Sequence, residues 1–107
     1  MSLSNFRPPV TTPVVDAHAH IFHQGMPLIA NPRHRPAYDF RLADYLTQLD
    51  QHGIDYGVIA AASPWGDFND YTRDCVSTTE RLRGTVILHP GRVYDFAGLS
   101  AAGIVGV

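Results

Sequence analysis

The chain has 107 residues, 45% of them hydrophobic and 17% charged, and its eight basic and ten acidic side chains leave a formal net charge of -2. This length and composition predict one globular domain with a packed core, and they exclude two domains, a disordered chain and a collagen-like chain. The slightly negative charge argues against nucleic acid and against an anionic membrane as partners.

The sequence carries no signal for export. Cys75 is the single cysteine, so no internal disulfide can form. The first ten residues hold no apolar signal segment, and the longest apolar run, residues 58–62, is far too short to span a bilayer. We therefore expect a soluble, cytoplasmic protein.

The predicted elements begin with a strand and a long loop. Residues 1–13 are expected to form an N-terminal extension, and the apolar stretch 14–21 predicts a strand. Residues 23–40 hold three prolines and follow neither a helical nor a strand period, which predicts a loop. Loops of this length are often binding loops or active-site lids.

Helices and strands then alternate along the rest of the chain. Leu42, Tyr45, Leu46 and Leu49 recur at helical spacing, with Asp39 available to cap the start. Gly53 is expected to end this helix, and a strand at 56–62 and a turn-rich loop at 63–69 follow it. A second helix is expected to start at Asp70 as its cap and to run to about Leu82, before a strand at 84–88. A helix at 95–102, ended by Gly103, and a strand that starts at 104–107 complete the chain.

This order predicts an α/β fold with crossover connections in a parallel sheet. Such sheets carry their functional residues at the carboxyl ends of the strands. Three predicted strands end near candidate residues, namely His20, Ser63 and His89. The apolar segment 104–107 has no polar exit, so we expect further strands beside it.

The most informative motif is His-x-His in the first strand. Strand alternation predicts Asp16, His18 and His20 on one face. The Cα atoms of His18 and His20 would lie roughly 6.5 Å apart, so both imidazoles could reach one divalent ion. Asp16 would either orient a histidine or cap backbone amides. The pair would bind metal or substrate; alternatively, it is a hydrogen-bonded pair on the surface.

Cationic residues cluster on the long loop, at Arg33, His34 and Arg35. Guanidinium groups bind carboxylates in a bidentate manner, so the cluster indicates a small anionic substrate. The alternative is a solvated loop whose arginines pair with Asp39 or Asp44.

Three further residues lie near the predicted strand ends. Ser63 could bind a substrate oxygen, and no adjacent His-Asp arrangement makes it a nucleophile. Trp65 is either a pocket wall or packed on its own helix. His89 either lines the pocket or belongs to a structural His-Pro-Gly turn. Cys75 is expected in the core.

Several segments together resemble a known family. Val-Asp-Ala-His-Ala-His-Ile resembles the first strand of the amidohydrolase superfamily, and more closely its amidohydrolase-related branch, which includes 2-pyrone-4,6-dicarboxylate lactonase. The likeness covers nearly the whole chain after Val14. The other segments that resemble the branch in order and spacing are Pro32-Arg33-His34-Arg35-Pro36, Leu-x-x-Leu-x-x-His-Gly at 46–53, Gly-Val-Ile before Ser63, Leu82-Arg83-Gly84, and Ala-Gly-Ile-Val-Gly-Val at 102–107.

The resemblance implies a TIM-like (β/α)₈ barrel. A barrel of this type needs about 250 residues, so residues 14–107 would supply about three and a half βα units of a partial barrel domain, truncated in the fourth strand. The general base of the family, an Asp after the eighth strand, would then lie beyond Val107, and we expect the 107 residues alone to be inactive.

The resemblance also implies roles for the candidate residues. His18 and His20 would be catalytic and would bind a divalent metal, with zinc the expected ion, or would contact the substrate in a metal-independent site. Ser63 and the first loop would help to bind a carboxylated ring, with arginines holding its carboxylates. The substrate-binding candidates are thus Ser63, Arg33, His34, Arg35 and His89, although His89 stands where an acidic residue is common in this branch.

The leading hypothesis is a hydrolase that acts on a lactone or other cyclic carboxylate through attack of an activated water on a carbonyl. A small carboxylated molecule would be its substrate, and a homo-oligomer is a further expectation. One alternative is a non-catalytic fragment that pairs its sheet edges with another chain. The second alternative is a metal-dependent phosphoesterase that also begins with a His-x-His strand.

Overall fold

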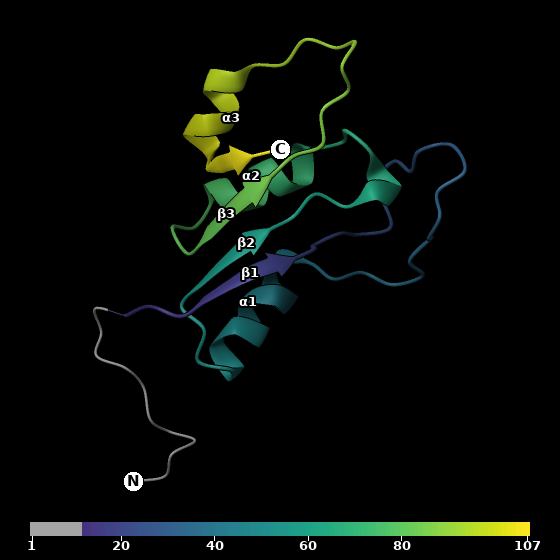
Figure 1. Ribbon diagram of the computed structural model, residues 1–107. Helices are drawn as coiled ribbons and strands as arrows, with labels where there is room; N and C mark the ends of the chain where they lie inside the picture. The colour runs from purple at the N-terminus through teal and green to yellow at the C-terminus, as the bar shows by residue number, and fades with distance from the viewer. Residues whose placement is uncertain (1–11) are drawn as a thin grey trace, which may run out of the picture.

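A four-stranded parallel sheet forms the centre of the structure, a computed structural model that describes residues 12–107. Each strand pairs with the next in the chain, in the order β1-β2-β3-β4 (Figure 1). The N-terminal extension predicted at 1–13 lies almost wholly outside the described residues. The elements are β1 (Val15–Ala19), α1 (Leu42–Gln51), β2 (Tyr56–Ile59), the 3-10 helix η2 (Ser63–Trp65), α2 (Asp70–Ser77), β3 (Leu82–Thr85), α3 (Phe96–Ala102) and β4 (Ile104–Gly106).

The helices cover one face of this sheet. Leu49 of α1, Ile59 of β2 and Leu82 of β3 are fully buried between the two layers, and Cys75 of α2 joins the same core as predicted. The other face stays open among the described residues, where Val105 of β4 is 64% exposed. The strands all point toward the side on which the loop of residues 23–40 extends (Figure 1).

Glycines follow two of the helices as predicted, and an aspartate caps the start of α3. Gly53 and Gly103 follow α1 and α3 with φ angles of 64° and 109°, a left-handed conformation that glycine adopts without steric cost. At the start of α3, the Asp95 carboxylate accepts a hydrogen bond from the Gly98 N–H at 2.9 Å. None of the helices formed by residues 12–107 is long and apolar enough to cross a membrane.

The prediction that Asp39 caps the first helix is wrong. The N-cap is Arg41, whose N–H donates to the Asp44 carboxylate at 2.8 Å. Asp39 instead accepts hydrogen bonds from the Gln24 N–H at 2.8 Å and from Arg41 Nε at 3.2 Å. The Gln24 hydrogen bond, helped by Arg41, lowers the pKa of Asp39. Asp39 therefore ties the long loop to the start of α1.

The second helix is displaced and shorter than predicted. Its N-cap is Asn69, not Asp70, which is the first helical residue. The helix ends at Ser77 because side-chain hydroxyl groups take over its last carbonyls: Ser77 Oγ donates to Asp74 O and Thr78 Oγ1 donates to Cys75 O, both at 2.7 Å.

The third strand accordingly begins earlier than predicted, at Leu82 rather than Gly84. Arg81 holds this start, because its guanidinium donates to the carbonyls of Ile54 and Asp55 at 2.9 Å just before β2. With Arg81 fixed there, Leu82 turns into the helix-side core, fully buried. Leu82, predicted at the end of the second helix, therefore packs into the core as the first residue of a strand.

Gly57 in β2 provides a test of the packing between sheet and helix. A Cβ atom at Gly57 would collide with the ring and hydroxyl of Tyr45 from α1. We expect Gly57→Ala to lower the free energy of unfolding by about 1–3 kcal/mol, measured by urea denaturation, because overpacking a core strains it. Gly106→Ala is the matched control, since its Cβ would meet Thr85 at an ordinary 3.6 Å. Equal effects of the two substitutions would contradict this packing.

Candidate active site at the carboxyl ends of the strands

One extra residue in β1 decides which way the candidate histidines face. Asp16 pairs with Gly57 and Ala19 pairs with Ile59, so three steps along β1 match two steps along β2. Gly57 and Ile59 both face the helices, as do Asp16 and Ala19 opposite them. A bulge of this kind reverses the alternation of side chains. The prediction that Asp16 shares a face with His18 and His20 is therefore wrong.

Asp16 lies under helix α1 and is held there by two hydrogen bonds. The Tyr45 hydroxyl donates to Asp16 Oδ2 at 2.8 Å, and the His18 N–H donates to Asp16 Oδ1 at 3.3 Å. Burial, followed by the bond to Asp16, raises the pKa of Tyr45, so its hydroxyl remains a donor. Of the two roles considered for Asp16, the capping of a backbone amide is the one that the structure contains.

The two histidines lie side by side beyond the bulge. Their ring centroids are 4.9 Å apart and nearly perpendicular. His20 Nδ1 lies 2.8 Å from the carbonyl oxygen of Ala60, at the end of β2. Because a carbonyl can only accept, Nδ1 must carry the proton, which leaves the Nε2 lone pair available to a metal ion or a proton. His18 is exposed beside it.

A pocket of about 320 Å³ brings together candidate residues from three segments. His20 comes from the end of β1, His34 from the long loop, and Ser63 from the first position of η2. These positions agree with the expectation that strand ends and their loops meet on one face. The other lining residues are Phe22, Pro36, Tyr38, Ala61, Ala62, Pro64 and Trp65.

Aromatic side chains make one wall of this pocket. Phe22 stacks on Trp65 with 5.0 Å between ring centroids and meets Tyr38 edge-to-face at 5.3 Å. Trp65 is 7% exposed, so it both packs in a small core and lines the pocket. Sequence reasoning missed Phe22 as a pocket residue, although its parity with His20 in the chain was the available signal.

The pocket does not include every candidate, and His18, the first histidine of the pair, is not among its lining residues. Arg33 and Arg35 lie exposed on the loop, on either side of His34. Asp39 forms its ion pair with Arg41, not with either of these arginines. His89 is exposed in the turn after β3, where its Nδ1 accepts from the Gly91 N–H at 3.1 Å.

The histidine pair could form part of a metal site. Histidines that bind a metal ion through one ring nitrogen commonly donate the other N–H to a carbonyl, as His20 does to Ala60. A catalytic zinc ion takes three protein ligands. Within residues 12–107, no group of three or more His, Cys, Asp or Glu side chains is arranged to hold a metal ion. The pair therefore fits as two ligands of a larger set.

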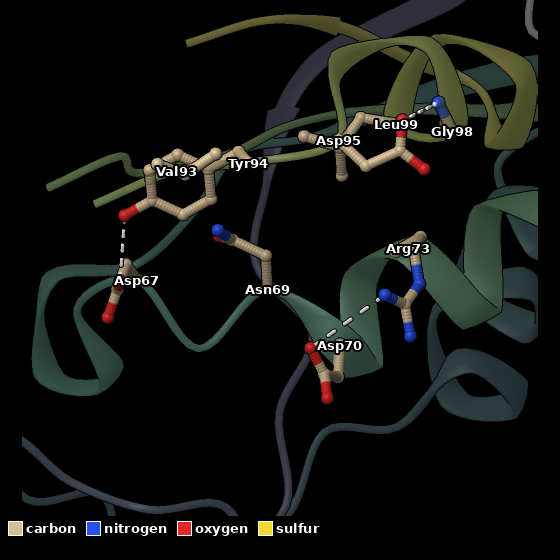
Figure 2. A pocket seen from close by; sticks show the side chains of 9 residues that line it. All are labelled: Asp67, Asn69, Asp70, Arg73, Val93, Tyr94, Asp95, Gly98 and Leu99. Carbon is tan, nitrogen blue, oxygen red and sulfur yellow. Dashed lines mark hydrogen bonds and ion pairs between the residues drawn. The ribbon is translucent and has the colours of Figure 1, made fainter.

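A second cavity, of about 330 Å³, lies between the starts of α2 and α3 (Figure 2). In its lining, Arg73 forms an ion pair with Asp70, and the Asp67 carboxylate accepts a hydrogen bond from the Tyr94 hydroxyl. None of the seven candidate site residues, all within the described part of the chain, belongs to its lining. It is therefore separate from the histidine pocket.

Asp67 at the rim of this cavity joins two of the loops that follow strands. Its carboxylate accepts from the Tyr94 hydroxyl at 2.8 Å and from Arg92 Nη1 at 2.8 and 2.7 Å. The Tyr94 oxygen in turn accepts from the His89 N–H at 2.6 Å. Asn69 adds a second link, because its amide bonds both the N–H and the carbonyl of Ile87.

Comparison with known proteins identifies one matching family model, described as Amidohydrolase, over residues 15–97. No curated protein matches the chain.

Three solved structures share the fold. A candidate 2-pyrone-4,6-dicarboxylic acid hydrolase from Acinetobacter baumannii, with citric acid bound, is 27% identical with a TM-score of 0.83 over 89% of this chain. A candidate 2-pyrone-4,6-dicarboxylic acid hydrolase from Pseudomonas putida is 36% identical with a TM-score of 0.75 over 89%. An apo protein from Agrobacterium tumefaciens is 27% identical with a TM-score of 0.75 over 87%.

The chain spans 36%, 36% and 35% of the lengths of these three proteins. The predicted fold class, α/β and the N-terminal part of a TIM-like (β/α)₈ barrel, is confirmed.

The Asp67 network yields a test of how the loops that follow β2 and β3 are held together. The Tyr94 hydrogen bond, followed by Arg92, lowers the pKa of Asp67. Its stabilising effect is therefore present above the ordinary carboxyl pKa and is lost as the pH falls through the lowered value. We expect Tyr94→Phe to raise the pKa of Asp67, measured by NMR titration of the carboxyl carbon. Tyr56→Phe, at the other end of the sheet, is the control. An unchanged Asp67 pKa in Tyr94→Phe would contradict the network.

Proposed function

Because the chain belongs to the amidohydrolase family, we propose that it supplies the first part of the active site of a hydrolase that acts on a lactone or other cyclic carboxylate. The resemblance to that superfamily is confirmed, as is the correspondence to an N-terminal portion.

The convergence of His20, His34 and Ser63 on one pocket carries this proposal. His20 and His34 bring imidazole rings and Ser63 brings a hydroxyl to a cavity that has an aromatic wall. Two structural relatives are named as candidate 2-pyrone-4,6-dicarboxylic acid hydrolases, and one of them holds citric acid, a carboxylated molecule. These names support a carboxylated ring as the substrate class over a phosphate ester.

His18 and His20 would hold a divalent cation, with zinc the expected ion. A bound ion of this kind supplies Lewis-acid polarisation of a carbonyl and a water of lowered pKa. The contribution of the chain is the orientation of His20, since the Ala60 carbonyl fixes its ring with Nε2 directed away from the sheet backbone. In the metal-independent alternative, the same nitrogen accepts a proton from water or, once protonated, donates to the substrate carbonyl.

The remaining pocket residues would bind and orient the substrate. Ser63 donates a hydrogen bond to a substrate oxygen, and the Phe22–Trp65 stack offers a flat apolar surface to a planar ring. Arg33 and Arg35 flank His34 and can reach carboxylates at the rim of the pocket. His89, outside the pocket, would bind a part of the substrate that extends toward β3.

Two earlier expectations stay predictions. The edges of the sheet formed by the described residues are β1 and β4, and pairing of these edges would produce the non-catalytic association considered above. A homo-oligomer is untested in the same way.

The proposal predicts that this chain can replace its counterpart in a relative. Residues 15–107 would substitute for the matching segment of the Pseudomonas putida protein, and hydrolysis of 2-pyrone-4,6-dicarboxylate would be followed by loss of pyrone absorbance. We expect turnover by the chimera, and a loss of at least about 100-fold in kcat/KM after His18→Ala with His20→Ala, because both acid–base and metal-binding groups disappear.

His52→Ala is the matched control, since that exposed ring bonds to the Gln48 carbonyl of its own helix and lies outside the pocket. Thermal melts would verify that all chimeras fold. Turnover unchanged in the double variant, or a folded chimera that hydrolyses phosphate esters and no lactone, would refute the proposed function.

A further inference from the structure

The bulge in β1 determines which way the histidine pair faces. Without the extra residue, His18 would stand opposite Ile59, on the face that α1 covers. Both imidazoles would then turn toward the core around Leu49, where polar groups need hydrogen-bond partners. With the bulge, Ala19 takes the core position, His20 lines the pocket and His18 is exposed beside it.

Two anchors force the extra residue into place. Ala19 is anchored on the helix side by its pairing with Ile59 and its contact with the core. Asp16 is anchored on the same side by the hydroxyl of Tyr45, which is 3% exposed and sits in the space that a side chain at position 57 would need. Regular alternation cannot place residues three apart on one face, so the strand must bulge between them.

The same carboxylate also fixes the backbone inside the bulge. Asp16 Oδ2 accepts from Tyr45 and Asp16 Oδ1 accepts from the His18 N–H. The interaction therefore runs from a helix, through a side-chain carboxylate, to the amide of the first histidine. Tyr45 lies outside the histidine pocket, and its hydroxyl is linked to β1 through Asp16. Its ring also contacts Phe40, a contact that Tyr45→Phe would retain.

The geometry points to Tyr45 as a positioning residue that, through Asp16 and the β1 bulge, holds His18 and His20 in the orientation needed to bind a divalent cation. The claim that the histidines bind a cation rests on the proposed function, whereas the claim that Tyr45 and Asp16 hold the β1 backbone at His18 does not. Substitution of outer partners of this kind typically reduces metal affinity by about 10–100-fold.

The test uses the 107-residue chain and Tyr45→Phe, which removes the hydroxyl and keeps the ring. Hydrogen exchange of the His18 amide would be measured by NMR, and Zn²⁺ affinity by competition with a fluorescent chelator. His18→Ala with His20→Ala would define the zinc bound elsewhere. We expect faster exchange at His18 and a zinc affinity lowered by about tenfold.

Tyr71→Phe is the matched control. The Tyr71 hydroxyl also bonds to α1, accepting from the Leu42 N–H at 3.1 Å, but has no link to β1. A general loosening of α1 would affect both variants, whereas loss of positioning affects Tyr45→Phe alone. Asp16→Asn, which keeps one acceptor oxygen, should retain more zinc affinity than Asp16→Ala.

Wild-type exchange at His18 in folded Tyr45→Phe would overturn the inference, as would an equal loss of zinc affinity in Tyr71→Phe. The exchange rate decides the positioning role even if the wild-type chain binds no zinc or the chimera hydrolyses no lactone. Failure of the proposed function and failure of this inference are therefore distinguishable.

Discussion

The hydrogen bond from Tyr45 to Asp16 is the contact on which the rest of the candidate site depends. It fastens helix α1 to the first strand at the one place where Gly57 leaves room for an aromatic ring. Because Asp16 and Ala19 are both held against the helices, β1 must contain an extra residue. A contact that belongs to the core thus determines the direction of the two side chains most suited to chemistry.

The other loops meet the histidines through separate contacts at the same edge of the sheet. The Ala60 carbonyl, at the end of β2, orients His20, and Ser63 follows three residues later in the same pocket. After β3, the side-chain amide of Asn69 donates to the carbonyl of Ile87 and accepts from its N–H. These bonds satisfy backbone groups that follow the last residue of the strand. Side chains thus fix loop positions that the short strands, of three to five residues, leave unpaired.

Local chemistry made much of the fold predictable, and long-range contacts account for the errors. The left-handed glycines Gly53 and Gly103 end helices in any context, and His-x-His spacing brings two rings together on any strand. The bulge was not predictable, because it depends on a tyrosine twenty-nine positions away. Likewise, Leu82 continues a helical pattern in the sequence, yet the bonds of Arg81 to residues before β2 place it in a strand.

The register of β1 against β2 is the central claim, and backbone NOEs from the 107-residue chain test it most directly. The structure predicts cross-strand NOEs that pair Asp16 with Gly57 and Ala19 with Ile59. A strand without the bulge would instead pair Asp16 with Gly57 and His18 with Ile59. Observation of the His18–Ile59 pair would contradict the account, because both histidines would then face the helices.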